Sequence, residues 1–204
     1  MPLVLECMTE TSKNILKSSN QKEQTLIERA KKEDASAFRE IVKSHKGHIA
    51  ATVRGMLGNV PEAEDVGQEV FIRFFKSIHN FKGLSSLKTY LTRIAINLSL
   101  NELQKRKQQY KHFEKGTTAD LKVSQKVVSN EQQNDVKQLI NMALEYLDPK
   151  FRTVLVLRSI QGYSTKETAA LMNIPLGTVL SRLNTGQKKL KEVIIKLNPD
   201  FLSY

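Results

Sequence analysis

Side chains suited to contacts with nucleic acid lie along the segment from Gly177 to Leu197. Apolar residues repeat there at intervals of three and four, which predicts a helix with one face packed against the protein. The other side carries hydroxyl, guanidinium and ammonium groups, which hydrogen-bond to phosphates and to base edges in a DNA major groove. For a basic helix taken alone, a solvated charged face is the alternative. These groups belong to Thr178, Ser181, Arg182, Thr185, Lys188 and Lys189.

A short helix is expected immediately before this segment. Ser164 and Glu167 have the spacing of a capping box, and Asn173 to Pro175 has the composition of a tight turn. Two helices joined by such a turn, the second of them basic, are typical of a helix-turn-helix. This combination favours DNA contact over a merely solvated face.

The segment from Pro61 to Ile78 has a different chemistry. Its first half contains four acidic residues and no basic one, so it would repel nucleic acid and should face a protein. Acidic residues in a first helical turn also stabilise the helix dipole, but this does not explain Glu69 beside an apolar Ile72. The outer stripe consists of Asp65, Gln68, Glu69 and Ile72. We expect the opposite, buried side to consist of Ala63, Val66, Val70, Phe71, Phe74, Phe75 and Ile78.

A third group of polar side chains follows one side of the helix predicted from Leu87 to Lys107. Amide and cationic donors recur there, and they suit both phosphates and bases. The loop before it, Phe81 to Ser86, contains an aromatic ring, a glycine and two hydroxyls, and could receive an unstacked base. The donors on the helix are Arg93, Asn97, Asn101, Gln104 and Lys105.

Catalytic and metal sites are not indicated by the sequence. The four histidines are scattered, and His45 and His48, three residues apart, lack a third ligand. There is no glycine-rich phosphate loop and no Ser/His/Asp set. The single cysteine, Cys7, rules out an internal disulfide and agrees with a reducing compartment. We therefore expect a protein that is not an enzyme and needs no cofactor or metal.

Composition narrows the class further. The 204 residues include 32 basic and 21 acidic ones, a formal charge of +11 that calls for an anionic partner. No apolar stretch approaches the ~20 residues of a membrane span, and the opening residues do not resemble a signal peptide, so we expect a cytoplasmic protein. With 9 Gly, 5 Pro and many 3.6-residue patterns, the chain is predicted to be all-α.

The patterns divide the chain into two small helical domains joined by a flexible linker. Polar, unpatterned sequence predicts a tail at each end and a linker in the middle. Asp148 followed by Pro149 predicts a helix start, and a break is expected near Asp34 to Ser36. The expected ranges are a tail over 1–21, a first domain over 22–108, a linker over 109–134, a helix-turn-helix domain over 135–197 and a tail over 198–204.

Three stretches together resemble a known family. The segments 65–71, 87–97 and 177–183 are similar to the signature sequences of bacterial extracytoplasmic-function, or group IV, sigma factors of the sigma-70 family. The resemblance covers about Leu26 to Leu197. It implies an RNA polymerase sigma factor that binds core polymerase, directs it to promoters and helps to melt the minus-ten element.

The resemblance also implies which surfaces contact which partner. The acidic stripe would bind the coiled coil of the largest polymerase subunit, and the polymerase flap and an anti-sigma factor would be further partners. Promoter DNA would be held as a single strand at the minus-ten element and as a duplex at the minus-thirty-five element. The minus-ten set is Phe81, Lys82, Ser85, Ser86, Lys88, Arg93, Asn97, Asn101, Gln104 and Lys105. The minus-thirty-five set is Ser164, Thr165, Thr178, Ser181, Arg182, Thr185, Lys188 and Lys189.

This sequence departs from the family pattern at several of these places. Leu180 stands where a basic residue is usual, and Thr185 and Gln187 occupy positions that are often Arg. Tyr90 replaces the usual Trp, and Asn101 stands where Asp is common. These departures bear on the number of phosphate contacts and on base preference.

Linker length gives a mechanistic expectation. The roughly 25 residues from Tyr110 to Asn134 would average ~25 to 30 Å as a flexible coil, whereas the two promoter elements lie on the order of 70 Å apart. The free chain should therefore bind promoter duplex poorly until polymerase holds the domains apart.

Two other functions fit part of the pattern. A polymerase-independent helix-turn-helix regulator that binds duplex DNA as a dimer leaves the acidic stripe unexplained. A helical adaptor for an acidic protein explains the charge but not the capped helix pair.

Overall fold

The computed structural model describes residues 21–114 and 132–199, and most of the predicted tails and of the predicted linker lie outside these ranges. Within the two ranges the chain forms helices and connecting turns, without a strand. This confirms the all-α prediction. In order, the elements are a helix over residues 21–31, α2 (Ala35–Leu57), α3 (Pro61–Ser77), η1 (Ile78–Asn80), α4 (Leu87–Glu114), α5 (Gln132–Glu145), α6 (Pro149–Leu155), η2 (Val156–Ile160), α7 (Thr165–Met172) and α8 (Leu176–Leu197).

Local capping explains where most of these helices begin. The Asp34 carboxylate accepts hydrogen bonds from the backbone of Ser36 and Ala37, which confirms the expected break before α2. The Ser36 hydroxyl and the Arg29 guanidinium also donate to this carboxylate, and together with the backbone bonds they hold the pKa of Asp34 well below its usual range. Asp148 caps α6 in the same way, by accepting from the Lys150 backbone. The Ser164 and Glu167 capping box is present at the start of α7.

Two elements differ from the sequence prediction. Helix α4 continues to Glu114 rather than ending near Lys107, because no Gly or Pro interrupts the sequence before Gly116. The single helix predicted from Pro149 to Gly162 is α6 followed by the π-helical turn η2, and Gly162, at φ 73°, ends it. Helices α4 and α5 thus both extend into the range predicted as linker.

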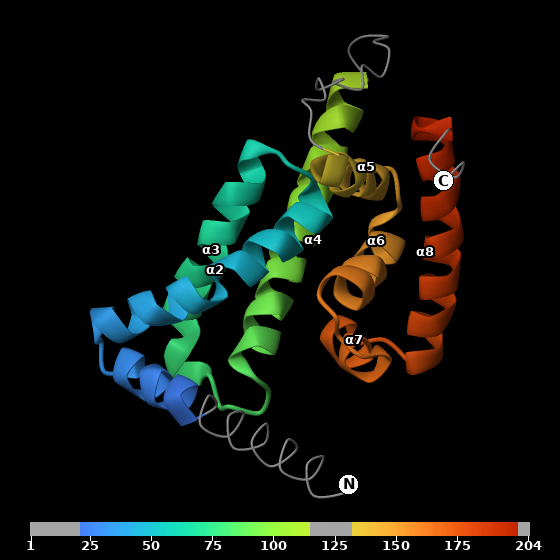
Figure 1. The fold of residues 1–204 in the computed structure, drawn as a ribbon. Coiled ribbons are helices and arrows are strands. Elements are labelled where there is room, and N and C mark those ends of the chain that lie inside the picture. The colour runs from blue at the N-terminus through green and yellow to red at the C-terminus, as the bar shows by residue number, and fades with distance from the viewer. Residues whose placement is uncertain (1–20, 115–131, 200–204) are drawn as a thin grey trace, which may run out of the picture.

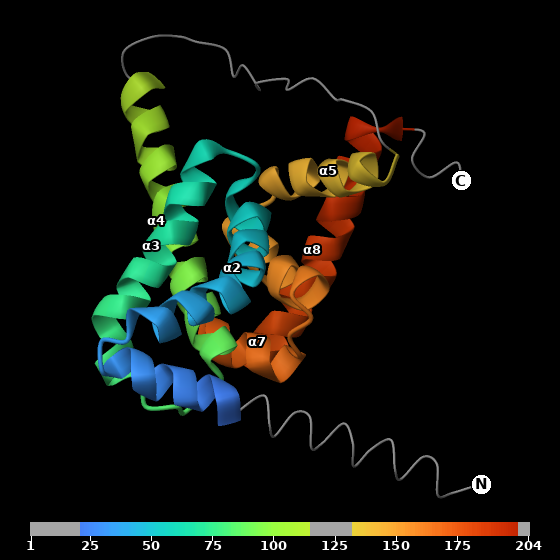
Figure 2. The same ribbon diagram turned by 60° about the vertical axis from the view of Figure 1, so that its left-hand side comes forward.

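The two halves of the chain pack against each other. Helices α2, α3 and α4 form the first half, and α5 to α8 form the second (Figure 1). Both views place α7 beside the beginning of α4, and α5 beside the C-terminal end of α8 (Figure 1 and Figure 2). One cluster of buried apolar residues runs through both halves, from Val53 and Met56 on α2 to Val156 and Leu157 in η2. A Cβ atom at Gly55 would lie 3.0 Å from a Val156 methyl, so this glycine permits close contact.

Candidate polymerase and nucleic-acid interfaces

Helix α8 is the outer helix of the second half, and its buried face can be located accurately. Val179 and Gly186 are buried, and a Cβ at Gly186 would lie 3.3 to 3.4 Å from Leu155 and Phe151 on α6. Of the residues predicted to contact DNA from this helix, Thr178 and Arg182 flank that contact and are half-buried. The remaining four are exposed, and they are Ser181, Thr185, Lys188 and Lys189.

The charge of α8 is available to a partner. Among ion pairs formed by the described residues, none involves a side chain of this helix. One of its cations already has a contact within the chain, because the Lys189 ammonium lies 5.9 Å from the centre of the Phe151 ring. On the preceding helix, the Ser164 hydroxyl accepts from the Glu167 backbone and so caps the helix start, and Thr165 beside it is half-buried.

Asn184 is a further polar residue of α8, which the sequence prediction did not include. This residue is exposed and lies three positions after Ser181, on the side opposite Val179 and Gly186. The predicted contact residues follow one flank of that outer side and include Thr178 and Arg182, which are half-buried. The signal that locates the outer face is the position of the small residue that lets α6 approach.

Helix α4 and the loop before it carry the residues predicted to contact the minus-ten element. Ser86 caps the helix, since its hydroxyl accepts from the Thr89 backbone. Phe81 differs from its neighbours because it is buried. The centre of its ring lies 5.1 Å from the centre of the Tyr90 ring and 6.3 Å from that of the Phe74 ring. In this structure the Phe81 ring anchors the loop by packing against Phe74 and Tyr90. Contact between this ring and a base would require the loop to open. The other predicted residues are exposed, and they are Lys82, Ser85, Ser86, Lys88, Arg93, Asn97, Asn101, Gln104 and Lys105.

Two of these cations contact the second half of the chain. The Arg93 guanidinium donates to the backbone carbonyl of Ala170 on α7, at 3.0 Å. The Lys88 ammonium lies 5.5 Å from the centre of the Tyr163 ring, in the loop before α7. The beginning of the α4 surface is therefore already engaged within the molecule.

The predicted polymerase-binding residues lie together on α3. Asp65, Gln68 and Ile72 are exposed, and Glu69 is half-buried and accepts from Arg73 at 2.8 Å. The expectation that Phe75 would be buried is wrong: the residue is 51% exposed, and its ring meets the Phe38 ring edge to face with 5.0 Å between ring centres. Ile72 and Phe75, three residues apart, form an exposed apolar pair beside the acidic residues. In a sequence pattern, an apolar residue at the edge of the buried face cannot be told from a buried one. For this reason Phe75 was predicted to be buried.

A buried arginine joins the two halves. Arg152 on α6 is 4% exposed and donates to the carbonyls of Glu145 and Leu147 in its own half and of Met56, at the end of α2. Burial lowers the pKa of this guanidinium, and the nearby Glu145 carboxylate opposes that effect. Its Nη1 and Nη2 atoms donate to these carbonyls from both halves, whereas Nε is buried without a hydrogen-bond partner among the described residues. Through Nη1 and Nη2 the side chain holds the end of α2 against the turn that follows α5.

Three polar side chains form a second junction between the halves. The Thr92 hydroxyl lies 2.9 Å from the Tyr163 hydroxyl and 2.8 Å from His48 Nε2. Burial, together with the charges of Lys88 and His45, lowers the pKa of His48 to about 4. Burial raises the pKa of Tyr163. All three groups are therefore uncharged at neutral pH, as a junction in a partly apolar setting requires.

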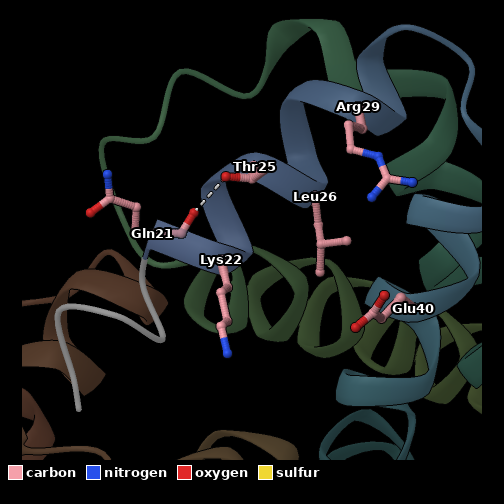
Figure 3. Close-up of a pocket in the computed structure, with 6 residues that line it drawn as sticks. All are labelled: Gln21, Lys22, Thr25, Leu26, Arg29 and Glu40. Carbon is pink, nitrogen blue, oxygen red and sulfur yellow. Dashed lines mark hydrogen bonds between the residues drawn. The ribbon is translucent and has the colours of Figure 1, made fainter.

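The described residues offer little to a small ligand. A shallow hollow lies beside the helix over 21–31, lined by Gln21, Lys22, Thr25, Leu26, Arg29 and Glu40 (Figure 3). It is open, and none of the residues predicted to contact polymerase or DNA lines it. Within the described ranges no three His, Cys, Asp or Glu side chains are placed to hold a metal ion, and no helix is long and apolar enough to cross a membrane.

Comparisons with known proteins agree on one family. Residues 41–109 match the family model for sigma-70 region 2, and residues 137–190 match that for sigma-70 region 4. The ECF RNA polymerase sigma factor SigW of Bacillus subtilis (strain 168) is 37% identical over 178 residues, which cover 81% of this chain and 93% of the relative. The ECF RNA polymerase sigma-E factor of Escherichia coli (strain K12) is 32% identical over 177 residues, covering 79% and 88%.

Solved structures show the same fold. The sigma factor RpoE, solved in complex with the anti-sigma factor NepR from Bartonella quintana, has a TM-score of 0.61 and covers 79% of this chain and 98% of its own. CnrH, solved in complex with the cytosolic domain of CnrY, has a TM-score of 0.63 and covers 85% and 97%. Each is 20% identical to this chain, so the likeness concerns the fold.

Proposed function

Since this chain belongs to the extracytoplasmic-function sigma factors of the sigma-70 family, we propose which of its surfaces perform the work of an RNA polymerase sigma factor. The protein binds core polymerase, directs it to promoters and helps to melt the minus-ten element. Sigma factors are not enzymes, and we propose that this chain likewise supplies binding energy while polymerase supplies the chemistry. We expect it to act in the cytoplasm, where the polymerase is.

The α3 surface is the proposed docking site for polymerase. Asp65, Gln68 and Ile72 are exposed there, and Phe75 extends the apolar part of the patch by one turn. On a chain of charge +11 an acidic helix half with an apolar centre is unsuited to DNA and suited to a basic protein surface. The resemblance implies that this surface is the coiled coil of the largest polymerase subunit.

The two DNA elements are assigned to separate halves of the chain. Helix α4 and the loop before it would hold the melted minus-ten strand, with the exposed amides of Asn97 and Asn101 available to unpaired bases. Helices α7 and α8 would hold the minus-thirty-five element as duplex, with α8 in the major groove. Melting would then be driven by the affinity of α4 for single-stranded bases.

The packing of the halves is the observation that carries this proposal. Arg93 donates to Ala170, and Lys88 lies against Tyr163, so part of the minus-ten surface is occupied by the helix-turn-helix half. Two elements on the order of 70 Å apart cannot both be held while these contacts persist. We infer that core polymerase separates the halves, and that the free chain binds promoter DNA poorly for this reason.

An anti-sigma factor is a proposed further partner. Among proteins of the same fold, RpoE was solved with the anti-sigma factor NepR, and CnrH was solved with the cytosolic domain of CnrY. A protein that stabilises the packed arrangement would keep the minus-ten surface engaged, which is a direct way to silence it. The flap of polymerase is proposed to hold the second half once the halves are apart.

Run-off transcription with purified core polymerase tests the proposed function. The full chain, added to core enzyme and a library of promoter fragments, should yield transcripts from a defined subset of fragments, whereas core enzyme alone should not. Co-purification of the chain with core polymerase in a stoichiometric complex should accompany this activity. Failure to form that complex under mild ionic conditions would overturn the proposal.

A further inference from the structure

The outer face of α8 is centred on four residues. Buried Val179 and Gly186 define the packed side, and the side opposite carries Gly177, Ser181, Asn184 and Lys188 at spacings of four, three and four. All four are exposed. If α8 enters a major groove, this is the stripe that reaches the groove floor first.

Gly177 supports the inference that this stripe meets a partner at close range. A Cβ atom at this position would have no atom of the chain within 4 Å, so internal packing does not require a glycine. The residue lies in the first turn of α8, and its φ is not among the positive values. Glycine is also a weaker helix former than alanine, so helix propensity does not favour it here. The missing side chain has no use inside the fold, and it leaves room for a DNA backbone or groove edge.

Asn184 is the side chain on this stripe with the chemistry to distinguish bases. The Ser181 hydroxyl donates to the Thr178 carbonyl, so its proton is already in use. The hydrogen bonds formed among the described residues do not engage the Asn184 carboxamide. An exposed carboxamide offers a donor and an acceptor side by side, which matches N7 and the N6 amino group of adenine in the major groove.

Leu180 supplies a second, apolar reading group. Its side chain is 49% exposed on the flank of the same stripe, one turn before Asn184, on a helix whose neighbouring surface is cationic. Apolar side chains in a major groove contact the methyl group of thymine. Lys188, one turn beyond Asn184, is placed to contact a phosphate.

We propose that Asn184 reads an adenine in the minus-thirty-five duplex and that Leu180 contacts a neighbouring thymine methyl group. This rests on the proposed role of α8 as the duplex-reading helix. The two residues together give the element a preference for A·T pairs at these positions, independently of the phosphate contacts that provide affinity.

Selection from a promoter library tests this assignment. Holoenzyme assembled from core polymerase and the full chain selects fragments in which the minus-thirty-five region is randomised. Wild type should enrich an adenine at one position, and Asn184→Ala should reduce that preference about tenfold or more without changing the others. Gln187→Ala is the matched control: it removes an exposed amide from the same helix, off the stripe, and should keep the adenine.

A modified base that lacks N7 tests whether Asn184 contacts that atom of adenine. With 7-deaza-adenine at the selected position, wild-type holoenzyme should bind several-fold more weakly, whereas the Asn184→Ala holoenzyme should not respond. An unchanged element in Asn184→Ala overturns the reading by Asn184 but leaves the role of α8 intact. If wild-type holoenzyme enriches no upstream element at all, the proposed role of α8 fails, and this inference fails with it. Circular dichroism of the variants checks that the helix is retained.

Discussion

Helices α4 and α8 are both assigned to DNA, yet the folded chain uses them differently. On α4, Arg93 and Lys88 already contact the loop and helix of the other half. On α8, Ser181, Asn184 and Lys188 face away from the protein. Packing of the two halves therefore competes with the proposed minus-ten contacts and leaves the proposed minus-thirty-five face of α8 exposed. A sigma factor regulated in this way would lose strand melting before it loses duplex affinity.

The difference follows from how the halves are joined. The contacts lie between the end of α2 and α6 with η2, and between the start of α4 and the Tyr163 loop. Both junctions join the second half to α2 and α4, whereas α8 lies on the side of the second half away from these helices (Figure 1). Changes at the junctions should therefore alter α4 and leave the α8 surface unaffected.

The largest effect on the free energy of unfolding is expected from Arg152→Met. This change removes the donors to Met56, Glu145 and Leu147 and leaves buried carbonyls unsatisfied. Loss of a buried, charged donor of this kind should lower the free energy of unfolding by about 3 kcal/mol. Urea unfolding followed by circular dichroism measures it. Arg182→Met on α8 is the control, with an expected change within about 0.5 kcal/mol, and equal effects of the two changes would refute the account of the junction.

A change in the α3 patch should weaken the affinity for core polymerase without affecting the packing of the two halves. Ile72→Asp places a charge in the centre of the apolar pair, and we expect a loss of about 2 kcal/mol in affinity for core polymerase, roughly thirtyfold. Fluorescence anisotropy with labelled chain measures the dissociation constant. Ile195→Asp makes the same change at an exposed isoleucine near the end of α8. If both variants bind core polymerase as wild type does, the α3 assignment is wrong.

Acid should weaken the junction that holds the start of α4. His48 has a pKa of about 4 in the folded chain and about 6.5 when unfolded. Between these values the unfolded chain binds a proton that the folded chain does not, so the free energy of unfolding falls as pH falls from 6.5 to 4. The expected loss is about 1 to 2 kcal/mol, because solvent screens a half-buried ring.

His48→Gln provides the comparison for the acid effect. Glutamine keeps a polar group near Thr92 but does not titrate in this range. The stability difference between wild type and His48→Gln, measured by urea unfolding at several pH values, should shift in favour of the variant as pH falls. A difference that does not change with pH would show that His48 does not respond to acid.

The smallest effect concerns single phosphate contacts. Non-specific DNA binding by the free chain should lose about 0.9 units of its log–log salt slope in Lys188→Ala, since one fewer counterion is released. Lys88→Ala should change the slope less, because that ammonium lies against the Tyr163 ring. A salt titration of both variants against wild type on random-sequence duplex measures the slopes, and a larger change for Lys88→Ala would reverse the order of the two surfaces.

Local sequence signals predicted the helices well. The carboxylate of Asp34, the Asp148–Pro149 pair and the Ser164 capping box begin helices where expected, since each signal acts within a few residues. The acidic stripe of α3 and the basic face of α8 are likewise readable from spacing alone. Their roles at polymerase and promoter remain predictions.

Contacts between distant segments could not be predicted from the sequence. Arg152 reads as a surface cation of an amphipathic helix, and only the position of Met56, 96 residues earlier, makes it a buried donor. The burial of Phe81 and the exposure of Phe75 depend on where Tyr90 and Phe38 lie. Helical periodicity distinguishes one side of a helix from the other, but it does not specify which neighbouring segment covers each flank.

Promoter binding with and without core polymerase tests the central claim most directly. The same fluorescent promoter duplex, carrying both elements, is titrated with the free chain and with the holoenzyme at one salt concentration. The account predicts that holoenzyme binds this promoter at least a hundredfold more tightly than the free chain does, relative to random-sequence duplex. Equal specificity for the free chain would contradict it, because the packed halves would then be no obstacle to promoter recognition.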